Sequence, residues 1–186
     1  MVYEGIIRGD LVELKAATVE DAEFTLSIRQ DPAITKYLPK LDITIEDQRK
    51  WILRQREKEG DYFFVIWNKA GKRIGTWGIY DIKGKTGEGG RLASYGDAFQ
   101  KIESGMLISY FQFEILKLEK VVGWVYADNR PVVKWIKWFG ADLGMPEKNE
   151  EGAMIRKMVQ NRDKAKCARE KIEEIMKKVL ENGRET

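Results

Sequence analysis

The sequence has 186 residues with 43% hydrophobic content, which is enough to build the core of one ordinary domain. Its single cysteine and lack of histidine exclude an internal disulfide, a zinc cluster and Ser/His or Cys/His nucleophilic catalysis, so we expect no metal site. The 33 basic and 30 acidic residues give a formal charge of +3, which is too balanced to indicate a nucleic-acid partner.

The N-terminal residues lack the basic start and long apolar run of a signal peptide, and no stretch approaches about 18 consecutive apolar residues. We therefore expect a cytoplasmic protein with no membrane partner.

The chain opens with a predicted strand and two predicted helices. Residues 11–16 alternate apolar and polar side chains, as a half-buried strand does. Capping-box patterns at Thr18 and Thr44 then predict two helices, the first of which should end near Pro32 because a residue before proline avoids the helical region. A strand followed by two helices is expected.

The middle of the chain predicts a β-hairpin. Residues 62–67 and 73–80 are rich in β-branched and aromatic side chains and flank a turn. The glycines of 84–90 predict a flexible loop, which should lead into a third strand at 91–95.

The second half alternates helices and strands. An apolar surface at helical spacing predicts a central helix over 102–116. A buried strand at 121–126, a short helix at 131–138 and a last strand at 153–159 are expected next. Residues 163–186 predict an amphipathic helix.

This succession, together with Ile74-Gly75 and with Asp128-Asn129 followed by Gly140, resembles the GNAT (GCN5-related N-acetyltransferase) superfamily. Residues 28–34 are similar to the branch that contains ribosomal-protein N-terminal, aminoglycoside and nucleotide-sugar acetyltransferases. The resemblance implies an α/β (α+β) acyl-CoA N-acyltransferase fold, with a mixed, bent central sheet flanked by helices and a V-shaped cleft. We expect a GNAT domain over 1–162 and an extra C-terminal helix over 163–186.

The family resemblance implies that acetyl-CoA is the co-substrate. A splayed strand, here Gly90 to Ser94, should pair with pantetheine and direct backbone N–H groups at the thioester oxygen. A glycine-rich turn normally binds the pyrophosphate, but residues 96–101 lack both motif glycines, and Asp97 adds a negative charge. Free N–H groups at a helix N-terminus can still bind phosphate. The predicted cofactor-binding residues are Leu92, Ala93, Ser94, Phe99, Gln100, Lys101 and Asn129.

Three residues are predicted to be catalytic. Without histidine, the general base must be a carboxylate, a tyrosine or a water chain, and we rank Glu88 and Asp97 first. The family often places a thiolate-protonating tyrosine seven residues after the asparagine, where this chain has Ile136, so Tyr126 is the proposed replacement and Tyr95 the alternative. Further base candidates near the expected cleft are Asp81 and Glu103.

The predicted reaction moves an acetyl group from acetyl-CoA to a primary amine by direct attack in a ternary complex. The acceptor is an amino sugar, a protein N-terminus or a small amine, and within the family we favour the amino sugar. The alternative is a GNAT-like binding or regulatory domain without acetyl transfer, because the loop glycines and the usual tyrosine are absent. The terminal amphipathic helix is consistent with a homodimer under either interpretation.

Overall fold

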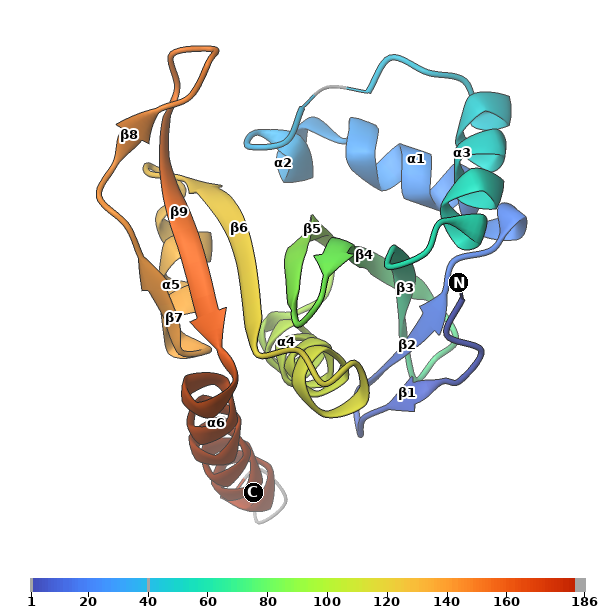
Figure 1. The fold of residues 1–186 in the computed structure, drawn as a ribbon. Helices are drawn as coiled ribbons and strands as arrows, with labels where there is room; N and C mark the ends of the chain where they lie inside the picture. Colours follow the sequence, from blue (N-terminus) through green and yellow to red (C-terminus); the bar gives the residue numbers. More distant parts are fainter. Residues whose placement is uncertain (1, 40, 183–186) are drawn as a thin grey trace.

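The computed structural model describes residues 2–39 and 41–182, which build one continuous sheet with helices on both faces (Figure 1). The sheet order is β1-β2-β3-β4-β5-β6-β9-β7, and β8 pairs with β9. The strands are β1 (Ile7–Arg8), β2 (Val12–Ala16), β3 (Tyr62–Asn68), β4 (Arg73–Lys83), β5 (Thr86–Ser94), β6 (Lys120–Tyr126), β7 (Ala141–Leu143), β8 (Glu147–Lys148) and β9 (Met154–Asn161). The helices are η1 (Val19–Asp21), α1 (Ala22–Gln30), α2 (Pro32–Thr35), α3 (Ile45–Glu57), α4 (Ala98–Tyr110), η2 (Phe111–Ile115), α5 (Arg130–Trp138) and α6 (Arg162–Asn182).

Strand alternation on β3 divides the domain into two apolar layers. Phe64 points to the face covered by α4 and η2, where its ring lies 4.8 Å from that of Phe111. Phe63 points to the opposite face, where its ring centre lies 5.1 Å from that of Trp51 of α3. Full burial of such side chains contributes roughly 1.5–3 kcal/mol each. The mixed, bent sheet flanked by helices matches the predicted fold class.

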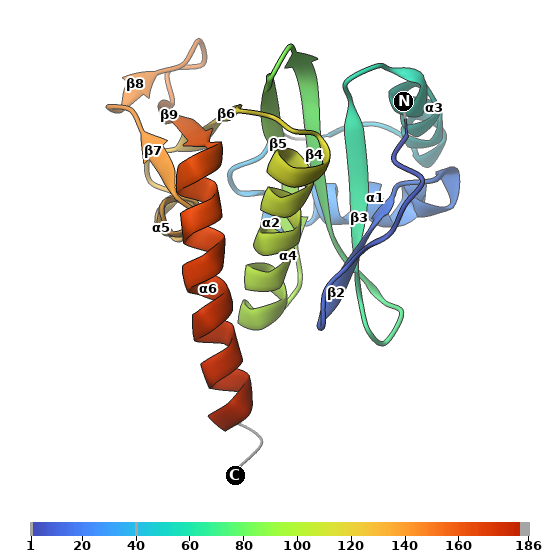
Figure 2. The same ribbon diagram turned by 60° about the horizontal axis from the view of Figure 1, so that its bottom comes forward.

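Helices α5 and α6 pack against the C-terminal strands of the sheet. Ile136 of α5 is buried with Val125 of β6 and Ala141 of β7. Helix α6 begins directly after β9 and lies beside α4, as Figures 1 and 2 both show. The predicted C-terminal helix is therefore present as far as Asn182, and residues 183–186 lie outside the described residues.

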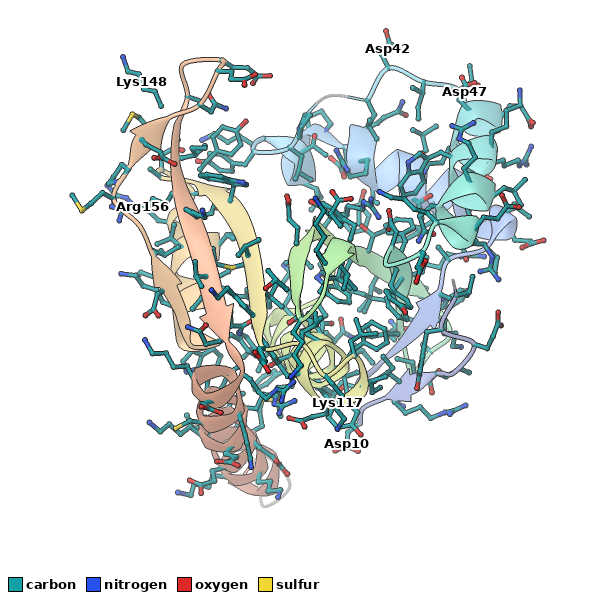
Figure 3. The ribbon with its side chains drawn as sticks, in the orientation of Figure 1. Asp10, Asp42, Asp47, Lys117, Lys148 and Arg156 are labelled. Carbon is teal, nitrogen blue, oxygen red and sulfur yellow. The ribbon has the colours of Figure 1, made fainter. Side chains whose placement is uncertain are left out.

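A buried carboxylate ties α4 to the first strands. Glu103 accepts hydrogen bonds from the backbone N–H groups of Asp10 at 2.8 Å, Leu11 at 2.7 Å and Val12 at 2.7 Å. Its side chain lies beside Gly9, where an added Cβ would come within 2.5 Å of the carboxylate. Figure 3 labels Asp10 beside α4, which is seen end-on. Glu103 is thus a structural anchor, and its placement near the cleft mouth was wrong.

The predicted flexible loop over 84–90 is also wrong. Strand β4 continues to Lys83, the turn is confined to 84–85, and β5 begins at Thr86. Glycines can continue a ladder because backbone groups alone make its hydrogen bonds. The absence of a side chain also leaves room for close neighbours, since an added Cβ at Gly87 would lie 3.0 Å from the Ile82 side chain.

The sequence analysis missed several short elements. Strands β1, β7 and β8 and helix α2 contain four residues or fewer, too short for a clear periodicity. Helix α4 starts at Ala98 rather than 102, because Asp97 and Gln100 form a capping box at its N-terminus.

The Glu103 anchor predicts a stability effect. Glu103→Gln keeps the shape but replaces one carboxylate oxygen with an amide N–H group, which cannot accept the strand N–H groups. We expect the free energy of unfolding to fall by about 1.5–3 kcal/mol, measured by urea denaturation. Glu147 is exposed, so the control Glu147→Gln should change the free energy of unfolding by less than about 0.5 kcal/mol. An unchanged midpoint for Glu103→Gln would contradict the anchoring role.

Candidate functional site

The sheet opens between β5 and β6. These strands pair in parallel at only three positions, Thr86 with Lys120, Gly87 with Val121 and Glu88 with Val122. Beyond them β5 stays paired with β4, while β6 stays paired with β9 (Figure 1). In the described part of the chain, the edge of β5 from 89 to 94 therefore has no strand partner on the β6 side. This open edge carries backbone donors and acceptors that a ligand can pair with.

Two glycines lie where the strands part. A Cβ at Gly123 would come within 2.9 Å of the Gly89 carbonyl oxygen, and a Cβ at Gly89 would meet Val121 at 3.2 Å. The backbones thus approach more closely than side chains on both strands would allow. Small residues at this point let the strands stay in contact until Glu88 and then diverge.

A β-bulge shapes the open part of β5. The register with β4 shifts between Thr76 and Gly78, and Arg91 has a positive φ of 56°. The Thr76 hydroxyl donates to the Arg91 carbonyl oxygen at 2.9 Å. Bulges bend a strand and redirect its backbone groups, and they are frequent beside active sites.

The Arg91 side chain holds this bulge in place. Its Nη1 and Nη2 atoms contact the two carboxylate oxygens of Asp61 at 2.6 and 3.0 Å, and only 3% of the Asp61 side chain is exposed. The guanidinium also lies 4.3 Å from the Tyr80 ring centre and 5.1 Å from that of Trp51. Sequence reasoning missed both Arg91 and Asp61, because their contact spans 30 positions and follows no local pattern.

Glu88 occupies the point where the strands separate. It is the last β5 residue paired with β6, and its Oε1 atom accepts a 3.2 Å hydrogen bond from the Tyr80 hydroxyl. Burial first, and then the Glu88 charge, raise the pKa of Tyr80 to about 12. Tyr80 therefore keeps its proton at neutral pH and donates a hydrogen bond to Glu88. The Oε2 atom of Glu88 has no hydrogen-bond partner among the described residues.

The other end of β5 leads into the N-terminus of α4. The Asp97 carboxylate accepts from the Gln100 backbone N–H at 2.9 Å, and the Gln100 side chain accepts from the Asp97 N–H at 3.1 Å. In the described structure the N–H groups of Ala98 and Phe99 have no partner, and Phe99 and Lys101 are exposed. Such a helix end can bind an anion.

The predicted cofactor-binding residues of β5 contribute backbone rather than side chains. Ala93 is buried, Leu92 packs against the main core, and the Ser94 hydroxyl accepts a 3.1 Å hydrogen bond from the Gly96 N–H. Ser94 lies six positions along the strand from Glu88, a distance of roughly 20 Å. The structure therefore does not bring Asp97, which lies beyond Ser94, next to Glu88.

Tyr126 and Asn129 lie across the opening, where β6 meets α5. Asn129 caps α5 by accepting from the Val132 N–H at 3.4 Å. The Tyr126 ring lies 5.7 Å from the Tyr37 ring, and the Tyr37 hydroxyl donates to Asp128 at 3.2 Å. The acidic role predicted for Tyr126 remains a prediction.

The remaining candidates have local partners. Asp81 is exposed and pairs with Lys58 at 3.0 Å. The Tyr95 hydroxyl donates to Asp31 at 2.8 Å and thereby ties β5 to α2.

A separate groove of about 680 Å³ lies between α4, α6 and the N-terminal segment, away from the opening between β5 and β6. Among residues 2–39 and 41–182, no helix is long and apolar enough to cross a membrane.

The comparisons with known proteins agree with this geometry. A family model described as an acetyltransferase (GNAT) domain matches residues 12–142. No curated protein matches the chain at a significant level.

Solved structures share the fold. Apo FdhC, a nucleotide-linked sugar GNAT, is 22% identical, with a TM-score of 0.76 over 87% of this chain and 93% of that one. Spermidine N-acetyltransferase from Vibrio cholerae, in complex with CoA and spermine, is 15% identical, with a TM-score of 0.76 over 84% and 99%. A GCN5-related N-acetyltransferase from Brucella melitensis is 14% identical, with a TM-score of 0.75 over 92% and 85%. At these identities the likeness concerns the fold.

The raised tyrosine pKa values predict a distinctive titration. Tyr80 and Tyr95 both have a pKa of about 12, with burial as the largest cause, so they should ionise after ordinary tyrosines near pH 10. A folded pKa above the unfolded value stabilises the protein below pH 10, and this contribution disappears as pH rises through 12. Ultraviolet titration of Tyr80→Phe and Tyr95→Phe should each lose one late-ionising group. Loss of a group near pH 10 instead would contradict the assignment.

Proposed function

This chain belongs to the GNAT acetyltransferase family, and on that premise we propose that it transfers an acetyl group from acetyl-CoA to a primary amine by direct attack in a ternary complex. The main support is the open edge of β5, which continues into the N-terminus of α4. One strand can thereby pair with the pantetheine arm while the helix end binds the pyrophosphate. The CoA complex of the Vibrio cholerae relative supports the use of an acyl-CoA.

The proposed cofactor contacts follow the chain from β5 into α4. Backbone N–H groups from Leu92 to Ser94 would bind pantetheine and the thioester oxygen, where each donor to the developing oxyanion lowers the barrier by about 3 kcal/mol. The N–H groups of Ala98 and Phe99, with the Lys101 ammonium group, would bind the pyrophosphate. The Gln100 side chain caps the helix, and Asn129 orients the loop across the opening.

Glu88 is the proposed general base. Its free Oε2 atom would accept a proton from the acceptor ammonium, directly or through one water, while Tyr80 orients Oε1. The amine nitrogen then forms a bond to the thioester carbon. Collapse of the tetrahedral intermediate breaks the carbon–sulfur bond, and the departing thiolate takes a proton from Tyr126 or from water. Asp97 is the weaker base candidate because it caps α4.

The acceptor class is proposed more broadly. Amino sugars remain our preference, and the fold shared with a nucleotide-linked sugar GNAT is consistent with it. A protein N-terminus or a small amine such as a polyamine is the alternative. We place the protein in the cytoplasm, and α6 is the proposed contact of a homodimer.

A second candidate function is a GNAT-like binding or regulatory domain without acetyl transfer. Asp97 supports it, because this carboxylate stands at the helix end proposed to bind pyrophosphate. The burial of Ile136 supports it too, since no hydroxyl lies at that position. Thiol release from acetyl-CoA with amino sugars, polyamines and a peptide amine separates the two functions. Release with any amine supports transfer, and no release with all three supports the binding domain.

Substitution of Glu88 tests the proposed base. Glu88→Gln should lower kcat by about 10²-fold or more and change the Kd for acetyl-CoA less than about threefold, because the amide cannot accept the proton. Part of the lost rate should return at high pH, where the amine is already deprotonated. Thiol-release kinetics and calorimetry measure both quantities. The matched control is exposed Glu147→Gln, and an unchanged kcat for Glu88→Gln would exclude this base.

Substitution of Asp97 tests the proposed pyrophosphate site. Asp97→Asn retains an N-cap side chain but removes the negative charge, so CoA should bind about 2–10-fold more tightly at low salt. The gain should shrink as salt screens the charge. The control Asp42→Asn changes the net charge equally on the loop between α2 and α3 (Figure 3). Equal CoA affinities for wild type and Asp97→Asn, measured by calorimetry, would place the pyrophosphate elsewhere.

A further inference from the structure

Arg29, in the last turn of α1, has an incompletely satisfied guanidinium. Its Nη2 atom donates to the Pro39 carbonyl oxygen at 3.2 Å. Its Nε atom is buried and has no hydrogen-bond partner among the described residues. Within the described chain no carboxylate lies within 4.0 Å of it, whereas Arg73, Arg91 and Arg169 all pair with one. A half-buried cation without an anion is costly, so it needs a reason.

The surroundings of Arg29 disfavour its positive charge. Burial first, and then the neighbouring Arg91 charge, lower the pKa of the Arg29 guanidinium. Arg91 itself is compensated by both carboxylate oxygens of Asp61. Among the described residues, the pair of arginines thus has one paired carboxylate, that of Asp61.

Arg29 lies on the same side of the sheet as the proposed base. Helix α1 contacts β4 and β5, and Arg29 neighbours Arg91, whose guanidinium lies over the Tyr80 ring. The Tyr80 hydroxyl in turn donates to Glu88. The N-terminus of α4 begins beyond the far end of β5, and the α4 helix covers the opposite sheet face. A ligand at Arg29 is therefore on the acceptor side rather than at the pyrophosphate.

We propose that Arg29 binds an anionic group, a carboxylate or a phosphate, of the acceptor, so that the substrate is an amine that also carries an acidic group. This rests on the proposed acetyl transfer. Glu88 would receive the ammonium end and Arg29 the anionic end, which gives each charged group an opposite partner. The planar guanidinium fork suits both carboxylate and phosphate.

The same charges disfavour a polycationic acceptor. A second ammonium group placed near Arg29 and Arg91 would meet like charges in a half-buried setting, which costs binding affinity. An acidic amine avoids this repulsion and gives the Arg29 guanidinium its missing anion. Among the proposed acceptor classes, a phosphorylated or acidic amino sugar therefore fits better than a polyamine.

The test follows the Arg29 Nε–H signal by nuclear magnetic resonance in the full chain, assigned by its loss in Arg29→Gln. The probes are O-phosphoethanolamine for phosphate, β-alanine for carboxylate, and putrescine as the dication. We expect the acidic probes to shift the signal saturably in the millimolar range, with the stronger shift identifying the group. Arg29→Gln should weaken binding of the preferred probe about tenfold, and exposed Arg49→Gln should leave it unchanged.

Three results would overturn the proposal. They are an Arg29 signal that neither acidic probe shifts, an equal shift with putrescine, and equal affinity of wild type and Arg29→Gln for the preferred probe. If Arg29→Gln does not fold, Arg29→Lys keeps the charge but lacks the Nε–H group and should bind the probe more weakly than wild type. The measurement needs no acetyl-CoA, so failure of acetyl transfer would appear separately in the thiol-release assay.

Discussion

The parting of β5 from β6 after three parallel residue pairs is the constraint on which the rest of the site depends. Each strand is held by its outer neighbour, β5 by β4 and β6 by β9, so the opening does not cost either strand its place in the sheet. Glu88 lies at the point of divergence, and the α4 N-terminus lies past the end of the open edge. The proposed binding, positioning and proton transfer would thereby be distributed along one strand.

The charged residues around this opening differ in how they are compensated. Glu103 is buried but accepts three backbone N–H groups, and the partly buried Arg91 pairs with the buried Asp61, so both contribute to the fold. Among the described residues, Arg29 has no carboxylate partner, and one oxygen of Glu88 has no hydrogen-bond partner. An uncompensated group of each sign on one side of the sheet is the arrangement that a zwitterionic substrate would complete.

The sequence could predict the elements with strong periodicity or caps, including α3 behind Thr44 and β6 with its buried alternate positions. It could not predict the first half of β5, because the glycines that signal a loop serve here for close backbone approach, a property of the neighbouring strands. The family resemblance located the open strand and the α4 N-terminus. Arg91 and Asp61 are 30 positions apart, so no local sequence pattern indicated their ion pair. The missing partner of Arg29 depends on the residues that surround it in the fold, so no local pattern indicated it either.

Hydrogen–deuterium exchange of the full chain with and without acetyl-CoA tests most directly whether the open edge of β5 is the cofactor site. The account predicts slower exchange in peptides that cover β5 from 89 to 94 and the first turn of α4, with little change in β1 or α6. Saturating acetyl-CoA that leaves exchange in β5 and α4 unchanged, or protection confined to the groove between α4 and α6, would contradict it.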